Sequence, residues 1–237
     1  MVNKISYINL IQQIKNEKKQ VFGSLNKLFS SGQFILGDEV DKFEKKVCKF
    51  LGVKNCVALN SGTDALVLGL YLLGVKKGDE VITPPNSFIA STAAIAHVGA
   101  IPIFADVRKD QNIDPNDIER KISRKTKAIM PVHLTGRACE MNEIKKLSNK
   151  YKIPIIEDAA QAIGTKYRNK FVGTFGDIGC FSAHPLKNLN AIGDAGYLVT
   201  NNKKLAQKAK ILRNHGIQKR NKVLSFGYVS RMDNLQA

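Results

Sequence analysis

The chain has 237 residues, of which 43% are hydrophobic and 24% charged, a composition typical of soluble globular proteins and unlike disordered or collagen-like chains. No run approaches the ~18 apolar residues of a membrane span, and the opening residues are too evenly charged for a signal peptide, so we expect a cytoplasmic protein with no membrane partner. The formal charge is +17, but aromatic residues make up only 7% and Trp is absent. Because single-stranded nucleic acids usually stack on aromatic side chains, we expect no nucleic-acid partner, with a nucleic-acid-binding protein driven by the charge as the alternative.

Two helices are predicted first. Apolar residues recur at helical spacing over 8–28 and again over 38–50, and Ser30, Ser31 and Gly32 interrupt the pattern between them. Asp38, after Gly37, is placed to cap the second helix. We expect residues 1–35 to form an N-terminal helical arm and residues 36–237 to form one large domain.

From residue 54 onward, short apolar runs alternate with longer helical segments. Strands are predicted near residues 57, 81, 102 and 128 and over 153–157, 178–182 and 197–200, and helices over 62–74, 88–98, 114–121, 140–150 and 202–213. This alternation predicts βα units, and hence an α/β fold with a mainly parallel sheet flanked by helices. The last eight residues, from Ser230, are typical of the opening of a helix. Because no helix-ending residue follows, we expect the sequence to be truncated.

Cysteine and histidine residues give no sign of a metal site. The four cysteines contain no CxxC pair, and the four histidines are equally dispersed, so zinc-type spacing is missing. We expect buried reduced thiols and no bound metal. The loop sequences GxGxxG and Walker A are also missing, which argues against NAD and ATP.

Two segments are candidates for ligand binding, one with donors for an anion and one with a carboxylate. In SGTDAL, residues 61–66, Gly62 and Thr63 lie between a predicted strand and a helix, where backbone N–H groups can bind phosphate; the alternative is an ordinary helix cap at Ser61. In IIEDAAQAIG, residues 155–164, Asp158 ends a strand at the edge where open α/β sheets bind ligands. The alternative there is a capping box with Gln161.

Two further segments offer an amine and a flat ring. In FSAHPLKNLNAIGDAG, residues 181–196, Lys187 follows a strand that ends at Ser182, and a loop there can desolvate the amine for covalent chemistry. A solvated surface lysine is the alternative. In PNSFIAS, residues 85–91, Phe88 is either a core residue or a face on which a planar cofactor stacks.

The order and spacing of these four segments resemble those of the DegT/DnrJ/StrS family of nucleotide-sugar aminotransferases, which use pyridoxal 5'-phosphate (PLP). The resemblance extends over nearly the whole chain, including GQFILGDEVDKFEK near the start and GYVSRMDNLQA at the end. It implies the large domain of a PLP-dependent transferase of fold type I, with the smaller C-terminal domain missing.

The resemblance also implies a role for each candidate residue. Lys187 is similar to the lysine that binds the cofactor covalently, and Asp158 to the acid that keeps its pyridine nitrogen protonated. Gln161 is implied near the ring oxygen and Phe88 on the ring face. The remaining implied positions, which bind the phosphate, are Gly62, Thr63 and Ser182.

The activity that the resemblance implies is transamination. Family members with His at the lysine position dehydrate sugars, whereas this chain has Lys187. We expect amino transfer from an amino-acid donor, glutamate by family habit, to a nucleotide-linked keto-sugar, in the biosynthesis of amino sugars for surface polysaccharide. A homodimer with an active site shared across its interface is also implied.

One residue departs from the family pattern. Val229 stands where family members usually have an Asn that reaches the cofactor phosphate of the partner subunit. Val cannot donate that hydrogen bond, which at a charged acceptor is worth about 1.5–3 kcal/mol, unless Ser230 or Arg231 replaces it. A noncatalytic or regulatory binding protein that keeps this fold is therefore the alternative.

Overall fold

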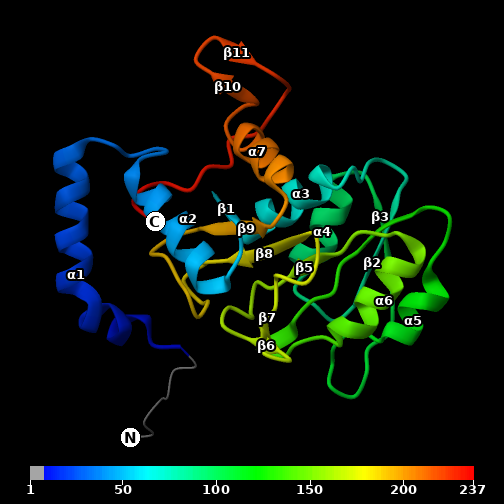
Figure 1. The fold of residues 1–237 in the computed structure, drawn as a ribbon. Helices are drawn as coiled ribbons and strands as arrows, with labels where there is room; N and C mark the ends of the chain where they lie inside the picture. Colours follow the sequence, from blue (N-terminus) through cyan, green and yellow to red (C-terminus); the bar gives the residue numbers. More distant parts are fainter. Residues whose placement is uncertain (1–7) are drawn as a thin grey trace, which may run out of the picture.

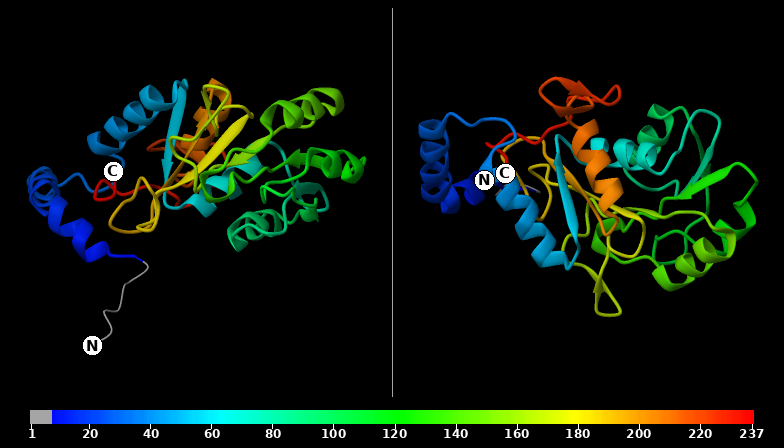
Figure 2. Two further views of the ribbon diagram at one scale, coloured as in Figure 1. Left: turned by 90° about the horizontal axis from the view of Figure 1, so that it is seen from below. Right: turned by 45° about the horizontal axis from the view of Figure 1, so that its top comes forward.

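The computed structural model describes residues 8–237, so the first seven residues of the expected arm lie outside the described part of the chain. The two predicted leading helices are present as α1 (Leu10–Ser31) and α2 (Asp38–Leu51). Gly32 ends α1 in the left-handed conformation, with φ of 64°, which Gly adopts without strain. Of the residues of α1, Leu28 alone is buried, and Figures 1 and 2 show this helix standing beside the sheet rather than on it.

The predicted alternation of strands and helices after residue 54 is confirmed. The elements are β1 (Asn55–Leu59), α3 (Gly62–Leu72), β2 (Glu80–Thr83), α4 (Ile89–His97), β3 (Ile101–Phe104), α5 (Pro115–Lys121), β4 (Thr126–Ile129), η1 (Leu134–Gly136), α6 (Met141–Tyr151), β5 (Ile156–Asp158), β6 (Lys166–Tyr167), β7 (Lys170–Phe171), β8 (Ile178–Ser182), β9 (Gly196–Thr200), α7 (Lys203–Leu212), β10 (Ile217–Lys219) and β11 (Lys222–Val223). Two short hairpins, β6–β7 and β10–β11, were not predicted.

The sheet is mainly parallel, as predicted. One part has the order β1-β9-β8-β5 and the other β3-β2-β4, and parallel bridges from Ile129 to Ile155 and from Val132 to Asp158 join them. β9 pairs antiparallel with both β1 and β8. Between β8 and β9 the chain forms a loop without a helix, and such a direct return is available only to antiparallel neighbours.

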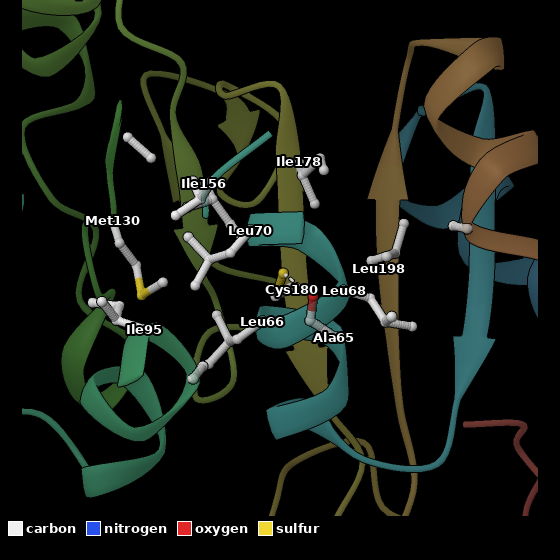
Figure 3. Close-up of a cluster of buried hydrophobic side chains, with 14 of the residues drawn as sticks. Ala65, Leu66, Leu68, Leu70, Ile95, Met130, Ile156, Ile178, Cys180 and Leu198 are labelled. Atoms are coloured by element: carbon white, nitrogen blue, oxygen red, sulfur yellow. Dashed lines mark hydrogen bonds between the residues drawn. The ribbon is translucent and has the colours of Figure 1, made fainter. Parts of the chain in front are cut away.

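Helices pack on both faces of this sheet. The α3 residues Leu66, Leu68 and Leu70 pack against Ile156 of β5 and Ile178 of β8 on one face (Figure 3). Each fully buried leucine contributes roughly 1.5–3 kcal/mol by leaving water. Because side chains alternate along a strand, other residues of β8 and β9 face α2 on the opposite side; the rings of Phe181 and Tyr197 stack there with centroids 5.0 Å apart.

The helix expected to open at Ser230 does not form there. Arg231 bridges to Leu59 of β1, and Asp233 bridges to Ile35, so the segment is extended. A turn begins only at Asp233, whose carbonyl accepts from Gln236 N–H at 3.0 Å. The prediction was wrong because the backbone N–H and C=O groups of this segment pair with β1 instead of within a helix, and the local sequence pattern does not reveal that pairing. In residues 8–237 no helix is both long and apolar enough to cross a membrane.

The packing at Gly196 provides a test of the close contact between β9 and the start of α3. A Cβ on Gly196 would collide with the backbone of Ser61 and Gly62, where β9 begins beside the start of α3. Gly196→Ala should therefore lower the free energy of unfolding by about 1–3 kcal/mol, because backbone on both sides has to shift. Urea denaturation followed by circular dichroism measures the change.

Gly23→Ala is the matched control for this substitution. A Cβ there, in the interior of α1, meets no atom within 4 Å. This variant should gain up to about 1 kcal/mol from helix propensity. Equal stability of the two variants would contradict the close approach of β9 to α3.

Candidate active site

A cavity of about 420 Å³ lies where β5 and β8 end and α3 and α4 begin. The position agrees with the rule that open α/β sheets bind ligands beyond the carboxyl ends of their strands. The structure brings all of the sequence-predicted site residues to its lining: Gly62, Thr63, Phe88, Asp158, Gln161, Ser182 and Lys187.

Asp158 is a buried acid at the end of β5. Its Oδ2 accepts a hydrogen bond from Ser91 Oγ at 2.7 Å, and its Oδ1 accepts from Ala160 N–H at 3.1 Å. Burial raises the pKa of the carboxyl above its ordinary value, and these two hydrogen bonds oppose the rise. Within residues 8–237, Asp158 forms no ion pair. The site therefore holds an acid that a bound cation would stabilise.

The capping-box alternative for Asp158 is wrong. No helix follows it, because Asp158 and Ala160 close a turn instead. The Gln161 side chain bonds to η1 and not to a helix start. Its Oε1 accepts a hydrogen bond from Thr135 N–H at 2.7 Å, which fixes the side chain against η1. Among the described residues its Nε2 has no acceptor, so this amide can donate to a ligand.

The first turn of α3 offers donors for an anion. Ser61 caps the helix, since its Oγ accepts from Asp64 N–H at 3.0 Å, so the capping alternative is also true. The N–H groups of Gly62 and Thr63 have no acceptor within the described residues. A Cβ on Gly62 would lie 2.7 Å from Ser182 Cβ, so glycine is needed where these two segments meet. Together the segments form an oxygen-binding corner, as a phosphate requires.

Lys187 and Phe88 lie at the open side of the cavity. Lys187 is half-buried in the loop between β8 and β9 and is close enough to Asp158 to favour its charged form. Phe88 precedes α4, and 69% of its surface is exposed, so the alternative of a core residue is wrong. The ring is free to cover a planar ligand.

Sequence reasoning missed Ser91 and the buried His133–Glu157 contact behind the site. Ser91, on α4, is buried and supplies the hydrogen bond to Asp158, and it accepts in turn from Ser87 Oγ at 3.1 Å. His133 Nε2 contacts Glu157 Oε2 at 3.0 Å, with both side chains fully buried. Ser91 was within the PNSFIAS segment, but only the fold brings it to a strand end 67 residues later.

Val229 and its neighbours lie away from this cavity. Val229 is exposed and bridges to Asn214. Ser230 Oγ donates to Asp64 Oδ2 at 2.7 Å, and Arg231 Nη1 donates to Asn214 Oδ1 at 2.8 Å. Neither side chain lines the cavity of its own chain.

The cavity residues fit PLP on their own chemistry. The cofactor carries a phosphate, a pyridine nitrogen that can be protonated, and an aldehyde. The α3 corner supplies N–H and hydroxyl donors, Asp158 is a buried acid with no ion-pair partner in residues 8–237, and Lys187 supplies an amine in the same cavity. No group of three or more His, Cys, Asp or Glu residues that could hold a metal occurs in residues 8–237.

Comparison with known proteins agrees with this site. A dTDP-3-amino-3,6-dideoxy-alpha-D-galactopyranose transaminase of Aneurinibacillus thermoaerophilus is 43% identical over 98% of this chain and 64% of its own length. The "Pleiotropic regulatory protein" of Geobacillus stearothermophilus is 39% identical over 98% of this chain and 63% of its own. The crystal structure of NtdA from Bacillus subtilis with bound cofactor PMP superposes with a TM-score of 0.94 at 37% identity, over 100% of this chain and 55% of that one.

These comparisons confirm the resemblance and the fold expected from the sequence. The chain spans less than two thirds of the length of each of these relatives. The sequence model of the DegT/DnrJ/EryC1/StrS aminotransferase family matches residues 15–237, which is nearly the whole chain. The chain therefore belongs to the DegT/DnrJ/EryC1/StrS aminotransferase family.

Proposed function

We propose that this chain carries the cofactor site of a PLP-dependent aminotransferase. The reaction transfers an amino group from an amino acid, glutamate, to a keto-sugar linked to a nucleoside diphosphate, in the biosynthesis of amino sugars for surface polysaccharide. The observation that carries the proposal is that one cavity joins Lys187, the buried acid Asp158 and the first turn of α3.

The residues divide the work of binding and proton transfer. PLP, when bound, supplies an electron sink for the carbanion that transamination requires. Asp158 would keep a proton at the ring nitrogen of the cofactor, with its carboxylate directed by the hydrogen bond from Ser91. Gly62, Thr63 and Ser182 would hold the phosphate, and Phe88 would cover the ring. Lys187 Nζ would hold the cofactor and, as a free amine, would move a proton at the substrate carbon.

Substrate class and assembly rest on separate observations. The matched Aneurinibacillus relative carries a dTDP-sugar transaminase name, and the net charge of +17 suits a doubly charged nucleotide. The β10–β11 hairpin and the residues after it expose Leu224 and Phe226, the latter 99% exposed, a surface that a second copy of the chain would cover. The four cysteines are free thiols, as in the reducing cytoplasm.

A regulatory binding protein is the second candidate. The name of the Geobacillus relative favours it, and so does Val229, which lacks the hydrogen-bonding group expected at that position. In that case the cavity would bind PLP or a sugar nucleotide without turnover. Amino transfer from glutamate to a nucleotide-linked keto-sugar distinguishes the two candidates, and it is measured by the formation of 2-oxoglutarate.

The role of Lys187 predicts the outcome of reductive trapping. Borohydride added to the PLP-loaded protein should fix the label on Lys187, identified by mass spectrometry of the digested peptide. Lys187→Ala should abolish trapping and lower amino transfer by at least three orders of magnitude, because neither the covalent link nor the proton carrier remains. Asn188→Ala, a change at the exposed neighbour, is the control. A label on another lysine would refute the proposed site.

The burial of Asp158 predicts opposite effects of Asp158→Asn on stability and on cofactor binding. The raised pKa means that ionisation of Asp158 costs more in the folded than in the unfolded apoprotein, so it lowers stability as pH rises from the unfolded pKa of ~3.9 through the folded pKa. Asn removes this cost, since Ser91 can turn its hydroxyl to accept from the new amide. The apo variant should equal or exceed the wild type in free energy of unfolding at pH 7, and any advantage should vanish near pH 4.

Cofactor affinity should change in the other direction. Loss of a hydrogen bond between charged groups, worth about 1.5–3 kcal/mol, weakens PLP binding about 10-fold to 100-fold. Urea unfolding of the apoproteins between pH 4 and 8 and fluorescence titration with PLP measure the two effects. A variant that is less stable than the wild type at pH 7 and binds PLP equally well would contradict the assignment.

A further inference from the structure

We propose that Asn190 and Gln13 are positioning residues for Lys187, so that the N-terminal helix α1 helps to fix the loop that carries the reactive amine. The inference rests on the proposed function of Lys187. The observation that supports the inference is a chain of two hydrogen bonds from α1 to the backbone of the lysine loop.

The loop between β8 and β9 is closed firmly at its base. Ala183 N–H donates to Ala195 O and Ala191 N–H donates to Ala183 O, both at 2.8 Å. Nearer the tip, Lys187 N–H donates to His184 O at 2.8 Å and Leu186 N–H to His184 Nδ1 at 3.2 Å. The base is therefore independent of α1, whereas the tip depends on a few local bonds.

Asn190 closes the tip around Lys187. Its Nδ2 donates to Pro185 O at 3.0 Å, so a side chain on one side of Lys187 is tied to the backbone on the other side. Because a carbonyl oxygen only accepts, this bond fixes the amide orientation and turns Oδ1 outward. There Oδ1 accepts from Gln13 Nε2 at 3.1 Å, a bond between residues 177 positions apart.

Gln13 is held in place by the start of α1. Its N–H donates to Asn9 O at 3.3 Å, and Asn9 Oδ1 caps the helix by accepting from Gln12 N–H at 3.0 Å. Along α1, this helix and the body of the domain line a cavity of about 730 Å³, to which Gln13, Pro185 and Asn190 all contribute. The Gln13–Asn190 bond therefore crosses one end of a largely open interface.

Leu186 gives a second link between α1 and the active site. Its side chain lines the active-site cavity and also a hollow under the first turn of α1 that includes Ile11 and Lys15. The residue immediately before Lys187 thus lies between the two. A movement of the first turn of α1 reaches the lysine loop on both sides of the reactive residue.

Hydrogen exchange of the apoprotein tests the link without the cofactor. Asn190→Ala and Gln13→Ala should raise the exchange rate of the peptide that spans 184–190 about twofold to tenfold, as expected from the loss of neutral hydrogen bonds. Asn188→Ala and Gln12→Ala are matched controls. Asn188, in the same loop, forms no side-chain hydrogen bond within the described residues, and the side chain of Gln12 bonds only within α1. Neither control should change the rate.

Asn190→Asp separates the two bonds of Asn190. The carboxylate still accepts from Gln13 but cannot donate to Pro185 O, so exchange should rise at the loop while protection of the α1 peptide is kept. Gln13→Ala should instead raise exchange in both peptides. Thermal melts of each variant confirm that the domain is folded. If loop exchange in Asn190→Ala, Asn190→Asp and Gln13→Ala equals that of the controls, the proposal is overturned.

A spectroscopic readout connects the loop to Lys187. In the PLP-loaded protein, Asn190→Ala and Gln13→Ala should shift the midpoint of the pH titration of the cofactor absorbance and slow borohydride trapping at Lys187 about twofold to tenfold, which loss of stability alone would not do. If the wild type fails to trap PLP at Lys187, the proposed function falls and this inference with it. If the wild type traps PLP and the variants match the controls, this inference alone falls.

Discussion

Two adjacent carboxylates at the end of β5 are both buried but have different surroundings, and the candidate site depends on that difference. Glu157 accepts from the backbone N–H groups of Gly173, Phe175 and Gly176 at 2.6–2.7 Å and contacts His133. Asp158 has two donors, no ion pair within the described residues, and a cavity in front of it. Alternation along a strand sends the two side chains to opposite faces. The Glu157 carboxylate therefore holds the loop over residues 173–176, whereas the Asp158 carboxylate faces the cavity.

The sheet topology places the partners of Asp158 around it. Parallel strands bring their carboxyl ends to one edge, so the ends of β5 and β8 and the start of α3 meet although they are far apart in sequence. The antiparallel β9 returns the chain without a crossover helix. That return leaves residues 183–195 as a loop at the same edge, and Lys187 belongs to it.

Local pattern was sufficient for the elements, because apolar periodicity identified the helices and the sheet strands. The segments around Gly62, Asp158 and Lys187 each had an ordinary structural alternative, and only their order and spacing, which resemble the family, pointed to one shared site. The structure places these residues around one cavity. Both hairpins turn on Arg-Asn rather than the Asn-Gly pair that marks such turns, so they were missed. The bond from Ser91 to Asp158 and the pairing of Arg231 with Leu59 are long-range contacts that no local window contains.

The tip of the lysine loop and the rest of the site are held by different parts of the structure. Asp158 and the first turn of α3 adjoin the buried core around α3, so we expect their opening to cost more free energy than that of the loop tip. The tip of the loop is different, because Asn190 connects it to α1, a helix with one buried residue. Elements with little buried surface open first, at a small fraction of the global free energy of unfolding. Through Asn190, Lys187 is thus connected to a helix with little buried surface, whereas Asp158 and the first turn of α3 adjoin the main buried core. We expect this division to let the lysine loop move without moving the buried acid.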